Sequence, residues 1–236
     1  MKSWIYAAGT AALLMLGSGT VRADDWTLPG GEILPLGRNV TVWEGKNSYL
    51  APKVDEMLKS PELSGKIAEE LIRLGVYGKD EKKAAQKTAE AAAAMLRESR
   101  VYQLRGVQGT TLYTACALSL PMELPLTEEE TARWKAWAEK AKTPLKGHGE
   151  LAESIHALSE AAGLAEQESG RSKGGVSYTV SHVYAAPEIK GYAIPFYAFA
   201  LGTTKDSRLT LTVVLTDQAS GAYFEPFLKR GVEAAR

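Results

Sequence analysis

Alternation of apolar and polar side chains is clearest in the last quarter of the chain, from residue 176 to residue 236. Apolar or amphipathic side chains take every second position over 176–184 and again over 209–215, mostly with hydroxyl residues between them. A period of two predicts strands with one buried face. Residues 191–201 are apolar on both faces, which predicts a strand covered on both sides and made irregular by Pro195.

A helix is predicted after these strands. Phe224, Phe227, Leu228 and Val232 recur at spacings of three to four residues, so they form one apolar stripe that fits across a sheet. Pro226 is then expected in the first turn of the helix, where its missing N–H is harmless. The end of the chain is therefore predicted to be a three-strand meander followed by a helix.

The preceding residues predict a further hairpin and a set of helices. The hairpin covers 101–120 with its turn at Gln108 and Gly109, and 26–44 contains one or two short strands. Helical spacing of apolar residues occurs in four segments: 61–74, 80–96, 128–141 and 150–162. Together these elements predict an α+β fold, with a mostly antiparallel sheet of about five to seven strands and helices packed on one face.

Residues 1–23 have the composition of a cleaved export signal. Lys2 precedes a short apolar stretch over 4–16, and a small-residue cleavage site ends at Ala23. The apolar stretch is too short to persist as a membrane anchor. We therefore expect a mature chain, 24–236, that is exported to the periplasm or the external medium, with a bacterial envelope as the favoured location.

Charge and cysteine content narrow the class of protein. The chain has 28 basic and 28 acidic residues, a balance that gives no electrostatic footprint for nucleic acid or for an anionic membrane. The single cysteine, Cys116, excludes an intramolecular disulfide, so the exported chain must depend on its hydrophobic core. We expect no nucleic-acid partner, and no stable membrane anchor after the signal is removed.

The domain organisation is expected to be simple. We predict a single α+β domain over 24–236, because the hairpin of 101–120 needs a larger sheet to join. The stretch 165–175, rich in Glu, Ser and Gly, is the one segment with the composition of a linker. A subdomain boundary near 163–175 stays open as an alternative.

One cluster of residues has partial metal-site character. His148, Glu150, Glu153 and His156 lie within nine residues, and the last two have the i, i+3 spacing of some zinc and di-iron sites. The H-E-x-x-H order is absent, and His148 precedes the expected start of the helix. Solvated helix charges explain the pattern better, so we expect no metal and no other cofactor.

Two candidate nucleophiles lie in unsuitable surroundings. Cys116 falls in the middle of a predicted strand on an apolar face, where burial raises the pKa of a thiol, and it would need His182 on an adjacent strand with a matching face. Ser172 lies in a Gly-x-Ser-x-Gly pattern, but a nucleophile elbow needs a strand before the serine and a helix after it. Here a polar segment precedes and a strand follows, so we assign no catalytic residue.

Tyr178, His182 and Tyr184 share one face of a predicted strand and are the candidate ligand-binding residues. If that face is half-open, two hydroxyls and an imidazole would orient a ligand against an apolar floor. The alternative, which is the more frequent arrangement, is that they pack beneath helices with the hydroxyls at the rim. Trp134 and Trp137 have the same ambiguity, and a core position is favoured over an exposed contact patch.

These observations favour a non-enzymatic envelope protein that binds a small ligand or a protein partner through its sheet face. The chain has no well-placed nucleophile, metal motif or nucleotide loop, and its motifs carry no family signature. The alternative is an exported hydrolase with an unrecognised site that uses His182, or His148 with Glu150. A structural or assembly subunit is a third hypothesis, for which an exposed tryptophan patch would be the indicator.

Overall fold

The computed structural model describes residues 25–44, 56–122, 127–141, 149–189, 191–206 and 208–236. The expected export signal, residues 1–23, and His148 lie outside the described residues. Within the described ranges, no helix is both long enough and apolar enough to cross a membrane.

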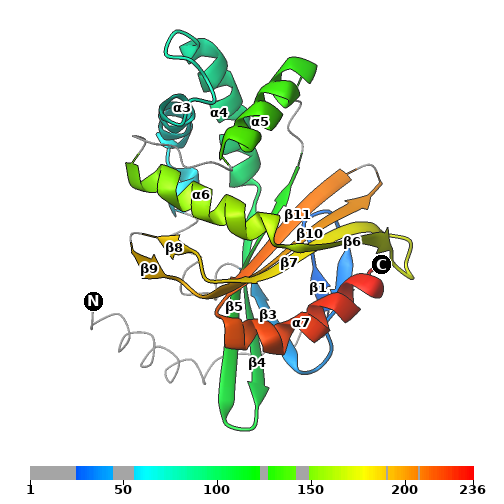
Figure 1. The fold of residues 1–236 in the computed structure, drawn as a ribbon. Helices are drawn as coiled ribbons and strands as arrows, with labels where there is room; N and C mark the ends of the chain where they lie inside the picture. The colour runs from blue at the N-terminus through cyan, green and yellow to red at the C-terminus, as the bar shows by residue number, and fades with distance from the viewer. Residues whose placement is uncertain (1–24, 45–55, 123–126, 142–148, 190, 207) are drawn as a thin grey trace.

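Seven antiparallel strands form the main sheet, in the order β3, β4, β5, β11, β10, β7, β6 (Figure 1). Their bounds are β3 (Val40–Glu44), β4 (Arg100–Gln108), β5 (Thr111–Pro121), β6 (Glu166–Arg171), β7 (Ser177–Ala185), β10 (Phe196–Lys205) and β11 (Arg208–Thr216). Two short pairs lie outside it: β1 (Asp25–Thr27) with β2 (Ile33–Pro35), and β8 (Glu188–Ile189) with β9 (Tyr192–Ala193). The predicted α+β fold with a mostly antiparallel sheet is confirmed.

Among the described residues, the longer helices are α3 to α6 and the C-terminal helix α7. Their bounds are α3 (Leu63–Arg73), α4 (Lys82–Arg97), α5 (Glu128–Ala141), α6 (Gly149–Gly163) and α7 (Gln218–Glu233). In Figure 1, α3 to α6 gather at the top of the view, and α7 lies across the strands near the lower right. Helix α7 follows β11 directly, which confirms the predicted meander and terminal helix.

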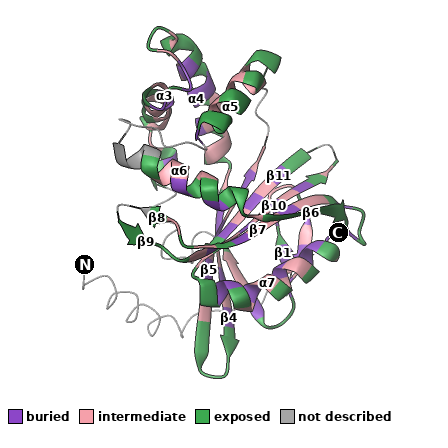
Figure 2. Cartoon of the chain, viewed as in Figure 1, coloured by how far each residue is buried: buried purple, intermediate pink, exposed green. Residues whose placement is uncertain are grey.

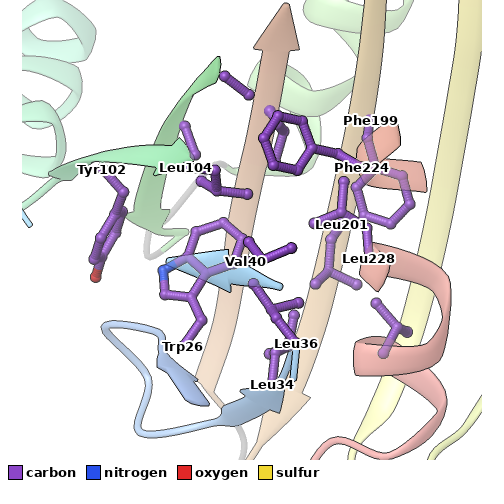
Figure 3. Close-up of a cluster of buried hydrophobic side chains, with 14 of the residues drawn as sticks. Trp26, Leu34, Leu36, Val40, Tyr102, Leu104, Phe199, Leu201, Phe224 and Leu228 are labelled. Carbon is purple, nitrogen blue, oxygen red and sulfur yellow. The ribbon is translucent and has the colours of Figure 1, made fainter. Parts of the chain in front are cut away.

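The main hydrophobic core lies between α7 and one face of the sheet. Phe199 and Leu201 of β10 lie against Phe224 and Leu228 of α7, and all four are at most 1% exposed (Figure 3). Trp26 and the apolar side chains of β2 close the other end of this core. Figure 2 shows buried residues on the central strands and on the inner side of α7, as expected for a helix that lies on a sheet.

A second core holds the helical group together. Trp134 and Trp137 of α5 meet edge to face, with ring centroids 6.0 Å apart, and both pack against the buried residues of α3 and α4. The Trp137 indole N–H donates to the Leu74 carbonyl at 3.0 Å. Helix α5 begins with a capping box in which the Glu130 N–H donates to the Thr127 hydroxyl at 3.2 Å and the Thr127 N–H donates to the Glu130 carboxylate at 2.9 Å. Trp134 and Trp137 are therefore half-buried at the edge of this core, and they form neither a fully buried stripe nor an exposed patch.

The start of α7 differs from the prediction. Asp217 is the N-cap and accepts a hydrogen bond from the Ser220 N–H at 2.9 Å, so the helix begins at Gln218 and Pro226 lies in its interior. The prediction that Pro226 lies in the first turn is wrong. A strong aspartate cap fixes the first turn eight residues earlier, and the Phe224 to Val232 stripe keeps the helix continuous through the proline.

The polar stretch that suggested a linker is a strand with a tight turn. Residues 166–171 form β6, which pairs with β7 at the edge of the sheet, and all six residues are exposed. The composition resembles a linker because neither face of this edge strand is buried, and charged residues are frequent on such edges. Apolar periodicity therefore gave no strand signal here.

The contact between α7 and β10 depends on a glycine, and this gives a first test. A Cβ at Gly221 would overlap the ring of the buried Tyr197. We expect Gly221→Ala to lower the free energy of unfolding by about 1–3 kcal/mol, because overpacking outweighs the better helix propensity of alanine. Urea unfolding of the purified wild type and variant measures this change in the free energy of unfolding.

The control is Gly65→Ala in α3, where an added Cβ meets nothing within 4 Å. This variant should be unchanged or more stable, by at most about 1 kcal/mol. Equal effects of the two substitutions would show that helix propensity, and not the Tyr197 contact, governs position 221.

Candidate functional site

The three predicted ligand-binding residues all lie on β7, but only two of them belong to one cluster. His182 and Tyr184 both reach Glu225 of α7. Tyr178 lies four residues away on the same strand, where its ring covers Gly170 of β6 at a position that leaves no room for a side chain. Burial raises the pKa of Tyr178. The structure therefore separates Tyr178 from the other two.

Glu225 is the centre of the cluster, and the sequence analysis did not identify it. Its Oε2 accepts a hydrogen bond from the Tyr184 hydroxyl at 2.6 Å, and its Oε1 lies 2.6 Å from the Lys229 ammonium. Oε1 also lies 3.8 Å from Nδ1 of His182. The Glu225 side chain is 19% exposed, so these contacts form in a partly desolvated setting where they are stronger than at an open surface.

The local charges set the protonation of Glu225. Burial acts to raise the pKa of Glu225, but hydrogen bonds from Lys229 and Tyr184 and the positive charge beside it outweigh burial, so the pKa lies below its usual value. Conversely, burial and the Glu225 carboxylate raise the pKa of Tyr184. At neutral pH the pair is thus an ionised carboxylate with a neutral phenol as donor.

His182 lies between two carboxylates from different elements. Its Nε2 is 3.1 Å from Glu166 of the edge strand β6, and its Nδ1 faces Glu225 of α7. The imidazole is 12% exposed, whereas the Glu166 side chain is 80% exposed. His182 therefore lies where β6, β7 and α7 meet, with Nε2 close to Glu166 and Nδ1 facing Glu225 beyond hydrogen-bond distance.

Tyr197 lies on β10, the strand next to β7, and completes the cluster. Its ring centroid lies 4.7 Å from that of Tyr184, and its hydroxyl is buried without a hydrogen-bond partner among the described residues. Burial raises the pKa of Tyr197, with further contributions from Glu225 and Tyr184. Its phenol thus stays neutral.

The residues missed by sequence reasoning had only a weak local signal. Glu225 and Lys229 have the i, i+4 spacing of a helical ion pair, but nothing in the sequence says that this pair faces the sheet. Glu166 lay in the segment interpreted as a linker. The charged groups of the cluster contact one another. The clearest effect of these contacts is to hold α7 and β6 against β7.

The thiol hypothesis fails on geometry. Strands β5 and β7 are separated by β11 and β10, so Cys116 and His182 are not on adjacent strands. They also point to opposite faces, because Ala115 and Ala117 pack toward α7 as His182 does and Cys116 alternates with them. Burial raises the pKa of the Cys116 thiol, as predicted for a structural cysteine.

Ser172 has a structural role in the turn between β6 and β7. It is 6% exposed; its hydroxyl donates to the Ala235 carbonyl at 2.6 Å and accepts from the Val176 N–H at 2.9 Å. The first hydrogen bond ties the turn to the end of the chain, and the second closes the turn itself. The Gly-x-Ser-x-Gly pattern is therefore a tight turn and not a nucleophile elbow.

The metal hypothesis gains no support from the described residues. His156 of α6 lies with Nδ1 3.3 Å from the Ala141 carbonyl oxygen and Nε2 3.4 Å from Glu160. The described part of the chain contains no group of three or more histidine, cysteine, aspartate or glutamate side chains arranged to hold a metal ion. His148 is outside that part, and so is the side chain of Glu150.

The face of the sheet opposite α7 is apolar and only half-covered. Side chains alternate along a strand, so the neighbours of Phe199 and Val214, which face α7, point to the other side. Three adjacent strands, β5, β11 and β10, place eight half-buried or exposed residues there: Cys116, Leu118, Ala198, Ala200, Leu209, Leu211, Val213 and Leu215. We call these eight residues the open apolar face.

The exposure of the open apolar face is unusual for its position. Leu209 and Leu215 are 42% and 50% exposed, although β11 is the middle strand of the sheet. Helices α4 and α6 contact β5 and β7, on either side of β11 and β10, and do not cover the middle fully. Central strands normally bury apolar side chains on such a face, and an exposed apolar patch commonly marks a binding surface.

Comparison with known proteins gives no relative for this arrangement. No family model matches the chain, and no curated protein or solved structure matches it significantly. Function must therefore be argued from the site itself.

The pH dependence of stability tests the Glu225 cluster. Because the folded-state pKa of Glu225 is lowered, its contribution to stability is present above the ordinary glutamate pKa of 4.5 and is lost as the pH falls through the lower folded value. Between about pH 5 and pH 3, wild type should therefore lose more unfolding free energy than Glu225→Gln. Urea unfolding across that range measures the difference.

The matched control is Glu69→Gln, which removes an exposed glutamate of α3 far from the cluster. Its pH profile should follow that of wild type. If Glu225→Gln also follows wild type, the contacts of Glu225 do not differ in strength between its charged and neutral forms.

Proposed function

We propose that this chain is an exported, non-enzymatic binding protein that holds the long apolar chain of a small amphiphile on its open apolar face. The observation that carries the proposal is the exposure of Leu209 and Leu215 on the middle strand of a seven-stranded sheet. Leu211 and Val213 lie between them on the same face and are half-buried. The result is a continuous apolar strip without a charged side chain.

The size of this face favours a single extended chain over a protein partner. Three strands about 4.8 Å apart and six residues of about 3.4 Å each give a face of roughly 14 by 20 Å, or about 300 Å². A stable protein interface needs about 800 Å² on each partner. An acyl chain laid along β11 matches the strip in width and length, and its polar head would lie at the end of the strands.

The expected affinity follows from the apolar area. Burial of about eight methylene groups at about 0.8 kcal/mol each contributes about 6 kcal/mol. This contribution alone would correspond to a dissociation constant of tens of micromolar, and the freedom lost on binding makes the expected affinity weaker than that.

The alternative function, a hydrolase that uses His182, has less support from the geometry. Both ring nitrogens of His182 face carboxylates, and no hydroxyl or thiol of the described residues hydrogen-bonds with it. A catalytic histidine needs a free nitrogen beside a nucleophile or water. Ester hydrolysis that disappears in His182→Ala would favour the enzyme over the binding protein.

Native mass spectrometry and fluorescence competition of the purified protein with hexadecanoate test the binding function. We expect one bound hexadecanoate, and at least a tenfold weaker affinity in Leu211→Thr/Leu215→Thr. Threonine keeps the strand propensity of these positions but removes the apolar contacts.

The matched control is Leu164→Thr, which replaces an exposed leucine in the turn after α6 and outside the face. It should bind hexadecanoate as wild type does. Unchanged binding in the double variant would overturn the proposed site. A discrete oligomer that dissociates in the double variant would instead assign the face to a second copy of the chain.

Export is tested separately by the N-terminus of the protein recovered outside the cytoplasm. The short apolar stretch and the small residues at its end support cleavage after Ala23, so sequencing should begin at Asp24. Recovery of the chain with residues 1–23 intact, in the cytoplasmic fraction only, would contradict this part of the proposal.

A further inference from the structure

A polar cavity lies at one end of the sheet, where Leu209 of the open apolar face is one of its lining residues. Its volume is about 350 Å³, and it is formed where β4 begins, β5 ends and β11 begins, under the loop between β1 and β2. Arg100, Glu98, Arg208, Thr210 and Gly30 are among its lining residues. This volume is at the lower end of the range for small-molecule sites.

Two buried polar groups beside this cavity have incomplete hydrogen bonding. Thr210 is 1% exposed and its hydroxyl has no partner among the described residues. Glu32 is 0% exposed; its Oε1 accepts from the Thr203 hydroxyl at 2.8 Å, and its Oε2 has no partner there. Unpartnered buried groups of this kind are rare because each costs about 1–3 kcal/mol.

Gly30 brings these two groups together at the wall of the cavity. A Cβ at Gly30 would lie 2.5 Å from Glu32 Oε2 and 2.5 Å from Thr210 Oγ1. Both oxygens therefore lie within a few ångströms of one point in the wall. A group that donates hydrogen bonds, and above all one that carries positive charge, would satisfy them.

The outer part of the cavity has the opposite chemistry. Arg208 is exposed and has no ion-pair partner among the described residues. Arg100 forms an ion pair with Glu44, with 3.5 Å between Nη1 of Arg100 and Oε1 of Glu44. Glu44 and Glu98 balance the two guanidinium groups in formal charge, so Arg208, which is exposed, is the group that can bind an added carboxylate, in the two-pronged geometry of a guanidinium.

We propose that this cavity binds a small zwitterion of amino-acid size. Its ammonium group lies toward Glu32 and Thr210, and its carboxylate is held by Arg208 with Arg100. Neither a simple anion nor a simple amine satisfies both ends. The site is separate from the Leu211 to Leu215 strip, because none of its lining residues belongs to that strip, although Leu209 of the open apolar face lies at its edge.

Isothermal titration calorimetry with L-alanine, glycine and the dipeptide alanyl-alanine tests the proposal. Propionate, which lacks the ammonium group, and ethylamine, which lacks the carboxylate, are the matched probes. We expect at least one zwitterion to bind, and both single-charge analogues to bind at least tenfold more weakly. Binding of propionate as tight as that of alanine would overturn the role of Glu32 and Thr210.

Amino-acid substitutions distinguish a loss of binding at the site from a loss of folding stability. Arg208→Gln changes an exposed side chain and should weaken zwitterion binding at least tenfold without changing the unfolding midpoint. Thr210→Val keeps the shape of the buried side chain and should weaken binding as well. Leu211→Thr/Leu215→Thr should leave zwitterion binding unchanged, so failure here is distinct from failure of the acyl-chain proposal.

The competing explanation is a buried water that satisfies Glu32 and Thr210 without any ligand. In that case no zwitterion binds, and Thr210→Val is less stable than wild type, because the water loses a hydrogen-bond partner inside the protein. That pair of results would overturn the proposal.

Discussion

The structure depends on the packing of α7 against one face of the sheet. Phe224, Leu228 and Val232 are at most 2% exposed, and burial of each such side chain contributes about 1.5–3 kcal/mol. The end of the chain extends this contact: the backbone of Arg236 pairs with Ile33 of β2, at 2.9 Å and 3.2 Å for the two hydrogen bonds. Helix α7 thereby joins the first and last segments of the described chain, and the Ser172 hydroxyl adds the β6–β7 turn to the same junction.

This single contact gives the two faces of the sheet different chemistry. The side of α7 holds the paired charges of the Glu225 cluster and the buried hydroxyls of Tyr197 and Thr210, which have no partner among the described residues. On the other side, the described helices leave Leu209 and Leu215 of the middle strand exposed. The two proposed binding sites follow from this asymmetry: one is an uncovered apolar strip, and the other is a polar cavity where the β1–β2 loop and the strand ends meet.

The Glu225 cluster explains why the predicted site residues resemble a binding site. Tyrosine and histidine at alternate positions are typical of ligand pockets, yet here they bind a glutamate of the same chain. The Glu225 carboxylate is partly buried and needs hydrogen-bond donors, because an unpaired buried charge would be costly. Tyr184 and Lys229 are those donors, and His182 extends the pairing to Glu166 on the edge strand.

Local patterns by themselves determined much of this protein. The period-two runs of β7 and β11 and the hairpin at Gln108 and Gly109 are set by residues close in sequence, and each was predicted correctly. Strand β6 and the interior position of Pro226 were not, because an edge strand has no apolar period and a proline inside a helix is tolerated only where packing on both sides holds the helix together. Only the tertiary structure decided which face α7 covers. That choice brought Glu225 to His182, placed Gly30 between Glu32 and Thr210, and left β11 exposed on the other side, because all three results depend on contacts between residues far apart in the chain.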